Sequence, residues 1–266
     1  LAGPVVGIAC DGTGYGPDGQ VWGGEVLVAD LAGFRRAARL RYVPLLGGDA
    51  AAVDTWRPAA AWVQAACGQA WSPAAERAFA GVDPRALGLA RRRLAGGGRL
   101  VQTSSLGRLF DAAAFLLGLC DRNRCEAQAA MALEAAASAA AGADELPYAI
   151  VEPAGDGPAQ IDASDLMRTL LAARADGADA GRLARAFHET VAAMFADAAG
   201  RAAEAAGVTD VCLTGGCMAN ALLLAALRRR LRAAGLTVYV HERVPPGDGG
   251  LALGQAVAAA ERMRRQ

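Results

Sequence analysis

The sequence predicts an α/β protein whose sheet is mainly parallel in its second half. Strand-like runs separated by turn residues fill positions 4–43, which indicates a meander. From about residue 56 the apolar spacing becomes helical, and residues 211–266 alternate between strand and helix patterns. At 266 residues and 54% hydrophobic, the chain is long enough to bury a sizeable core.

The first strands follow from apolar runs and one turn signal. Residues 5–10 are continuously apolar, and residues 21–28 and 34–43 are the next two predicted strands. Between the first two, Pro17, Asp18 and Gly19 predict a turn, because proline presets φ and glycine supplies a positive φ. A loop begins at residues 47–49.

The middle of the chain predicts helices. Five of them span 57–69, 73–80, 84–94, 126–141 and 181–206. A further helix is capped by Ser104 or Ser105 and runs to about Leu117, and another starts at Asp162. Asp165 in a first turn suits the helix dipole. In the last helix an apolar stripe (Leu183, Phe187, Val191, Met194) is expected to face the core. Residues 147–151 predict a short strand.

The last part reads as a βαβ unit. Residues 211–213 predict a buried strand, 214–216 a tight turn, 217–233 a helix and 236–240 the next strand, with the final helix opening at 248–250. Such a unit implies parallel strands covered by helices.

Composition excludes several classes of protein. The 27 basic and 27 acidic residues cancel, which argues against nucleic-acid and membrane-surface partners. No uncharged apolar run reaches the roughly 18 residues of a membrane-spanning helix. Every basic residue is Arg, so a Walker A lysine and a Schiff-base lysine are absent.

The His and Cys residues exclude common metal sites. Two His residues cannot form a three-His zinc site. His188 and Glu189 begin like a zincin motif, but Ala192 stands where the second His belongs, so we interpret them as a polar pair on an amphipathic helix. The six Cys lie mostly in apolar runs, which predicts reduced, buried thiols in a cytoplasmic protein.

Three Gly-rich segments are the candidate site. They are residues 11–16 (DGTGYG), 214–216 (TGG) and 247–250 (GDGG). Glycine lets backbone N–H groups approach an anion, and a neighbouring carboxylate can hold a divalent metal. Together they favour a nucleotide or phosphate site over simple tight corners. The strict dinucleotide fingerprint fails, because the first segment leads into strands.

Two further carboxylates have open interpretations. Asp111 lies on a largely apolar helix and is either a solvated side chain or part of a site. Glu126 opens a predicted helix, where it either complements the dipole or contacts a ribose.

These motifs resemble, in order and across nearly the whole chain, the hydrogenase-maturation carbamoyltransferase family HypF. The matching stretches are residues 7–16, 22–25 (WGGE), 45–49, 103–105 with 107–111, 126–131, 213–216 with Asn220, and 248–255. The resemblance implies a carboxy-terminal domain akin to the tRNA threonylcarbamoyl-transferases. It would have an actin/sugar-kinase-like (ASKHA) two-lobed fold, with the first lobe truncated at its N-terminus. Residues 1–56 would be the remaining strands of the first lobe, and 57–266 the helical segments and the βαβ second lobe.

The resemblance also implies a reaction. Upstream domains of the family make carbamoyl-adenylate from carbamoyl phosphate and ATP. This domain then transfers the carbamoyl group to the C-terminal Cys thiolate of a HypE-type partner, on the way to the cyanide ligand of nickel–iron hydrogenase. A metal polarises the reacting oxygens, so no nucleophile of the domain itself is needed.

The resemblance also implies which residues of this sequence match the family's site residues. Asp11 and Asp248 match two metal-ligating aspartates, for iron or zinc. The nucleotide-site matches are Gly12, Thr13 and Gly14 beside the phosphate, Gly107, Asp111 and Glu126 toward the ribose, and Gly215, Gly216 and Asn220 around the nucleotide.

The sequence departs from the family in a few places. The family's His-x-x-x-His metal pair lies upstream of residue 1, and Cys125, Ala127 and Gly247 replace the expected Tyr, Gly and Asn. Two alternatives stay open: an O-carbamoyltransferase of a small hydroxyl compound or a tRNA-modifying relative on the same fold, and a non-catalytic nucleotide-binding fragment. Exposed edges left by missing first-lobe strands would favour a homodimer.

Overall fold

The computed structural model describes residues 3–96, 100–153 and 155–265. The described strands form one mixed sheet in the order β6-β7-β3-β2-β1-β8-β9, with β4 and β5 beside β2. Their bounds are β1 Val5–Tyr15, β2 Val21–Ala29, β3 Phe34–Leu40, β4 Val43–Pro44, β5 Gln102–Thr103, β6 Ala149–Val151, β7 Ala159–Asp162, β8 Asp210–Thr214 and β9 Thr237–Tyr239.

The sheet joins the two ends of the chain. β1 is antiparallel to β2 but parallel to β8, and β8 is parallel to β9. The parallel part predicted for the second half is confirmed, whereas β1–β2–β3 is an antiparallel meander. Strands from both predicted segments, 1–56 and 57–266, hydrogen-bond into this sheet, and a two-lobed division near residue 56 stays a prediction.

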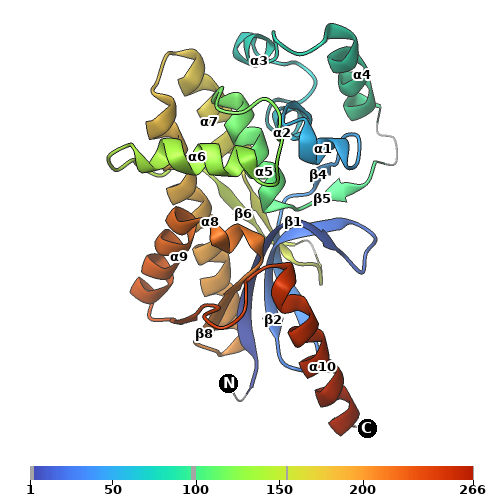
Figure 1. Ribbon diagram of the computed structural model, residues 1–266, viewed down its shortest axis with the longest axis vertical. Coiled ribbons are helices and arrows are strands. Elements are labelled where there is room, and N and C mark those ends of the chain that lie inside the picture. The colour runs from blue at the N-terminus through green and yellow to red at the C-terminus, as the bar shows by residue number, and fades with distance from the viewer. Residues whose placement is uncertain (1–2, 97–99, 154, 266) are drawn as a thin grey trace.

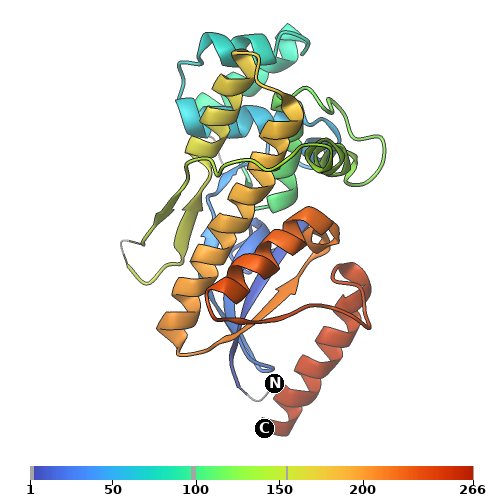
Figure 2. The same cartoon turned by 90° about the vertical axis from the view of Figure 1, so that its left-hand side faces the viewer.

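Most helices gather at the end of the molecule that lies above the sheet in Figure 1. The helices are α1 Ala50–Val53, α2 Trp56–Cys67, α3 Pro73–Ala78, α4 Pro84–Ala95, α5 Leu106–Leu116, α6 Gln128–Ser138, α7 Ser164–Ala175, α8 Ala180–Ala206, α9 Ala221–Ala233 and α10 Leu251–Arg265, with 3-10 turns at Gly216–Ala219 and Asp248–Gly250. Figure 2 shows α8 running from this helical end down along the sheet.

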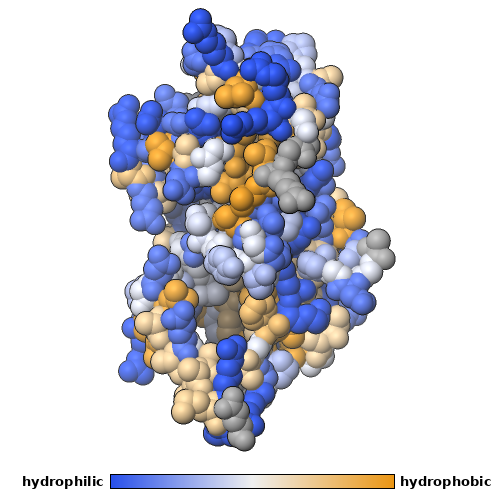
Figure 3. All heavy atoms as spheres, turned by 90° about the vertical axis from the view of Figure 1, so that its right-hand side faces the viewer, coloured by the Kyte–Doolittle hydropathy of each residue, from blue (hydrophilic) through white to orange (hydrophobic). Residues whose placement is uncertain are grey.

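The core centres on α8. Its predicted stripe is confirmed, because Leu183, Phe187, Val191 and Met194 are all buried. On the surface, the face in Figure 3 is hydrophilic over much of its area, with a strongly apolar patch in its upper half and more weakly apolar areas in its lower half. Among the described residues, no helix combines the length and apolarity needed to cross a membrane.

Three predicted helix starts are wrong. Asp162 ends β7 instead, because its Oδ1 accepts the Ser164 N–H (2.9 Å) and α7 begins at Ser164. Residues 216–219 form a 3-10 turn, so α9 begins only after its cap Asn220. Glu126 lies in a turn, since Ala127 adopts φ 56° and α6 starts at Gln128.

His188 links α8 to the start of α9. Its Nδ1 lies 2.8 Å from the Ala184 carbonyl oxygen and its Nε2 lies 3.0 Å from the Asn220 amide nitrogen. In the neutral tautomer, Nδ1–H donates to Ala184 and Nε2 accepts from Asn220. The side chain is therefore the predicted structural polar residue, buried to 1% exposure, and burial lowers its pKa.

We expect acid to destabilise the protein through His188. The unfolded state takes up a proton below its ordinary pKa of about 6.5, whereas the folded state resists it. Stability is full above that pH and falls by up to about 1.4 kcal/mol for each pH unit below it, until the folded pKa is reached. Urea unfolding from pH 8 to pH 5 measures this slope. His188→Gln should flatten it and His241→Gln, at an exposed position, should not; equal slopes in both variants would contradict the assignment.

Candidate functional site

The first Gly-rich segment is a bulge inside β1 and not the predicted loop. The β1–β2 register jumps from the pair Cys10↔Gly24 to the pair Gly14↔Trp22, so residues 11–13 bulge out of the ladder. Asp11 opens the bulge, and its Oδ1 accepts the Gly12 N–H at 2.7 Å. Thr13 is exposed at the bulge. The strand continues because the flanking residues still pair with β2.

Helix α5 begins against this bulge. Ser105, one of the two predicted caps, accepts the Arg108 N–H, and its hydroxyl lies 2.7 Å from the Gly12 carbonyl oxygen. Gly107 is required by the close approach, since a Cβ there would stand 2.8 Å from the Gly12 Cα. The cap and the glycine together bring the first turn of α5 onto the residues after Asp11.

The second and third Gly-rich segments meet the first. The Gly215 N–H donates to the Pro246 carbonyl at 2.8 Å, which ties the turn after β8 to the segment before α10. A Cβ on Gly216 would lie 3.1 Å from Asp11 Oδ1, and one on Gly247 would lie 3.5 Å from the Gly216 Cα. All three segments therefore converge beside Asp11, as the sequence predicts for a single site.

Two thiols lie beside Asp11. Desolvation, followed by the charge of Asp11, raises the pKa of Cys217 to about 12. Desolvation and then the neighbouring Cys217 raise the pKa of Cys10 well above its ordinary value. Both thiols therefore stay protonated near neutral pH and are poor nucleophiles.

Asp111 lies in a buried polar group. It is 1% exposed; its Oδ1 accepts from Asn123 Nδ2 at 3.1 Å, and its Oδ2 lies 3.0 Å from Arg108 Nη2. Desolvation raises the pKa of this carboxyl, against the lowering effect of Arg108. Asn123 fixes the group, because it also donates to the Ala52 carbonyl.

The other predicted site residues are placed differently. Asn220 caps α9 through Oδ1, which accepts the Leu223 N–H, while its amide meets His188. Glu126 and Asp248 are exposed. The described residues include no group of three or more His, Cys, Asp or Glu side chains able to hold a metal ion. Asp11 and Asp248 would therefore supply only part of a coordination sphere.

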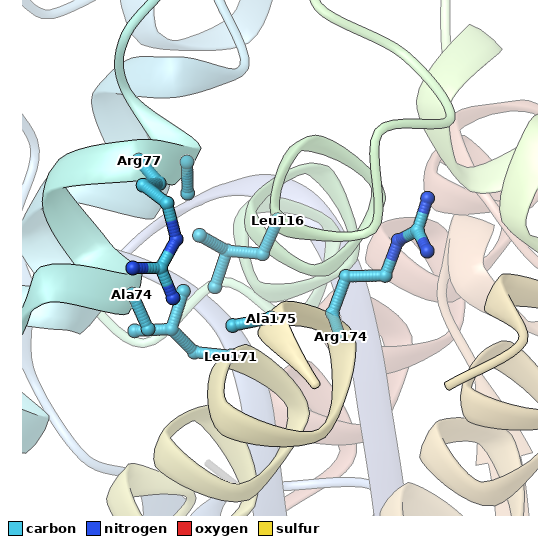
Figure 4. Close-up of a pocket in the computed structure, with 7 residues that line it drawn as sticks. Ala74, Arg77, Leu116, Leu171, Arg174 and Ala175 are labelled. Carbon is cyan, nitrogen blue, oxygen red and sulfur yellow. The ribbon is translucent and has the colours of Figure 1, made fainter. Parts of the chain in front are cut away.

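A separate cavity lies between helices away from the Gly-rich segments. Figure 4 shows this space of about 180 Å³ between α3, α5 and α7, with Arg77 and Arg174 at its sides. Its lining contains none of the predicted site residues. The Gly-rich site and this cavity are therefore separate places on the molecule.

A family model described as "Carbamoyltransferase, Kae1-like Domain, second subdomain" matches residues 7–255. The chain belongs to the HypF carbamoyltransferase family. The predicted resemblance is therefore confirmed. The family's Kae1-like description also agrees with the α/β fold, while the ASKHA lobes and the truncation stay predictions.

Curated HypF proteins match almost the whole chain. Carbamoyltransferase HypF of Rhodobacter capsulatus is 42% identical over 98% of this chain and 33% of its own length. The HypF of Rhizobium leguminosarum bv. viciae is 40% identical over 98% of this chain and 32% of its own length. A HypF homolog of Cupriavidus necator is 38% identical, with 97% and 65% covered. The chain spans about one third of the length of the first two relatives.

Solved HypF structures share the fold. A full-length HypF in a phosphate- and nucleotide-bound form superposes with a TM-score of 0.90 at 34% identity, over 99% of this chain and 34% of that one. HypF of T. kodakarensis gives a TM-score of 0.80 at 32% identity, with 97% and 34% covered.

Sequence reasoning missed two largely buried arginines of this HypF domain. Arg108 stands beside the predicted Gly107 and Asp111, and Arg36 pairs with Glu25 of the WGGE motif. Arg108 could have been found as a basic residue inside the matched stretch 107–111, whereas Arg36 lies in the predicted strand 34–43, outside every matched stretch, and carries no such signal.

Proposed function

We propose that this HypF domain binds ATP or carbamoyl-adenylate at the Gly-rich site around Asp11. There it would transfer the carbamoyl group to the C-terminal Cys thiolate of a HypE-type partner. The convergence of the three Gly-rich segments on Asp11 supports this proposal, because backbone amides without side chains are suited to phosphate. The activity would belong to a longer protein, since the chain covers about a third of the length of the first two relatives above.

The proposed transfer balances without a nucleophile from this chain. The partner's thiolate sulfur bonds to the carbamoyl carbon, the carbon–oxygen bond to the adenylate phosphate breaks, and AMP leaves with the electron pair. The raised thiol pKa values of Cys10 and Cys217 support an external nucleophile. The residues of this chain would bind and orient the adenylate and exclude water from the acyl carbon.

A divalent metal, iron or zinc, is part of the same proposal. When bound, it would polarise a phosphate or carbamoyl oxygen. Asp11 and Asp248 would contribute carboxylate oxygens to it, and the remaining ligands would come from outside the described residues.

The test is calorimetric titration of ATP, with and without a divalent metal, into this chain. We expect Asp248→Ala to weaken metal-dependent ATP binding about tenfold or more, the loss of roughly one charge-assisted contact. Asp176→Ala is the matched control, because Asp176 is exposed at the end of α7. Binding that is identical in all three proteins would contradict the assignment of Asp248.

A further inference from the structure

Arg108 places a guanidinium beside the Asp11 bulge. It lies in the first turn of α5, directly after Gly107, with only 12% of its side chain exposed. Its Nη2 lies 3.8 Å from the place that a Gly12 Cβ would occupy. The charge of Arg108 also lowers the pKa of Cys217, which Asp11 raises. The cation therefore belongs to the same local electrostatic environment as Asp11.

The donors of this guanidinium are largely unused within the described residues. Nε and Nη1 are buried there and have no hydrogen-bond partner, and Asp111 Oδ2 lacks one as well. Nη2 and Asp111 Oδ2 are 3.0 Å apart, a contact of charges without a well-aligned hydrogen bond. Buried donors without partners are rare in folded proteins, because leaving them unpaired destabilises the fold, and more so when the group is charged.

A planar guanidinium with free donors matches an oxyanion. Arginine donors bind phosphate and carboxylate oxygens in a bidentate fork. The neighbouring backbone is Gly12 and Gly107, so no side chain from these two residues blocks an approaching anion. The carboxylate of Asp111, 3.0 Å from Nη2, offsets the charge of this cation.

We propose that Arg108 binds phosphoryl oxygens of the nucleotide, and that Asp111 positions Arg108 instead of contacting the ribose. This inference rests on the proposed function and deepens it. Asp111 is only 1% exposed and its Oδ1 is held by Asn123, so burial keeps a sugar hydroxyl away from the carboxylate. Its buried charge has Arg108 as its nearest cation.

The test compares ATP, pyrophosphate and adenosine by calorimetry in the wild type, Asp111→Asn and the double variant Arg108→Met/Asp111→Asn. The double variant avoids a buried, unpaired carboxylate and should therefore fold. We expect it to lose at least tenfold in affinity for both ATP and pyrophosphate, with adenosine binding unchanged. Arg91→Met, which removes a half-buried arginine paired with Glu76 on another helix, is the matched control and should bind like the wild type.

Asp111→Asn separates positioning from ribose contact. A positioning residue should weaken ATP and pyrophosphate alike, whereas a ribose contact should weaken ATP and adenosine but spare pyrophosphate. The second result would overturn the role of Asp111.

The outcomes also separate this inference from the proposed function. Full ATP affinity in the double variant would overturn the role of Arg108 and leave ATP binding standing. If the wild type binds pyrophosphate but not ATP, and pyrophosphate binding is lost in the double variant, the result would support the anion site and overturn the nucleotide function. A wild type that binds none of the ligands would overturn both.

Discussion

Replacing Arg36 with Met should lower the free energy of unfolding by about 3–5 kcal/mol at neutral pH, the usual effect of removing one partner of a buried ion pair. Its partner Glu25 is 2% exposed, with Oε1 2.6 Å from Arg36 Nη2. The other oxygen of Glu25 accepts the N–H groups of Gly23 and Gly24, both at 2.7 Å. The variant would leave this carboxylate buried without its cation.

Arg36 also holds the hairpin beyond the bulge. It donates to the Tyr42 hydroxyl at 2.9 Å, and its guanidinium carbon lies 3.8 Å from the Trp22 ring centroid. Tyr42 in turn donates to Asp18 in the β1–β2 turn. The loss should therefore loosen the hairpin as well as the ion pair.

The pH dependence identifies the cause. Burial already raises the pKa of Glu25, and Arg36 works against that rise. Without Arg36 the folded-state pKa climbs further, so the stability deficit should be largest above that pKa and shrink as the pH falls through it and Glu25 becomes protonated. Chemical denaturation at pH 5 and pH 8 measures the difference.

Two variants control this experiment. Arg35→Met removes an exposed neighbour on β3 and should change stability by less than about 0.5 kcal/mol. Adding Glu25→Gln to Arg36→Met should recover part of the loss. Equal deficits for Arg35→Met and Arg36→Met, or a deficit that ignores pH, would refute the argument.

Gly215→Ala should cost about 2–6 kcal/mol, from backbone strain of about 1–3 and overpacking of about 1–3. Gly215 has φ +96°, and a Cβ there would stand 2.0 Å from the Cys10 carbonyl oxygen. Cys10 and Gly215 directly follow Ala9 and Thr214, the last pair of the β1–β8 ladder, so the backbone of neither residue can move aside easily. The substitution should also separate the turn after β8 from Asp11 and abolish ATP binding.

Gly235→Ala isolates the strain. Gly235 has φ +79° with open space around it, so alanine there suffers the backbone strain alone. Urea unfolding of the two variants should show a clearly larger loss at Gly215. Equal losses would mean that the contact with Cys10 contributes nothing.

The predictions that succeeded depended on local signals. Ser105 caps α5, the α8 stripe is buried, and strands β8 and β9 are parallel, because capping, helical spacing and the βαβ pattern are each readable within a short window. The three Gly-rich segments also meet as expected.

The failures depended on contacts with other elements, which the local sequence does not contain. The residues after Asp11 resemble a loop, yet β2 keeps β1 extended on both sides of the bulge. Asp162 resembles a helix start, but it ends strand β7, and its carboxylate pairs with Arg41. Arg108 has an unremarkable local sequence; its burial beside Gly12 depends on how α5 packs on the bulge.

The parallel pairing of β1 with β8 bears on how the protein folds. Val6 pairs with Val211, so the strand that carries Asp11 must wait for a partner from the far end of the chain. Contacts between residues this far apart in sequence form late and slow folding, because a long loop must close before they can form. During synthesis, the β1–β2–β3 meander would emerge with one edge of β1 uncovered and prone to pair wrongly. The surface that we propose to bind the nucleotide would thus be completed only near the end of folding, and a partly folded chain would be unable to bind a nucleotide there before its sheet is complete.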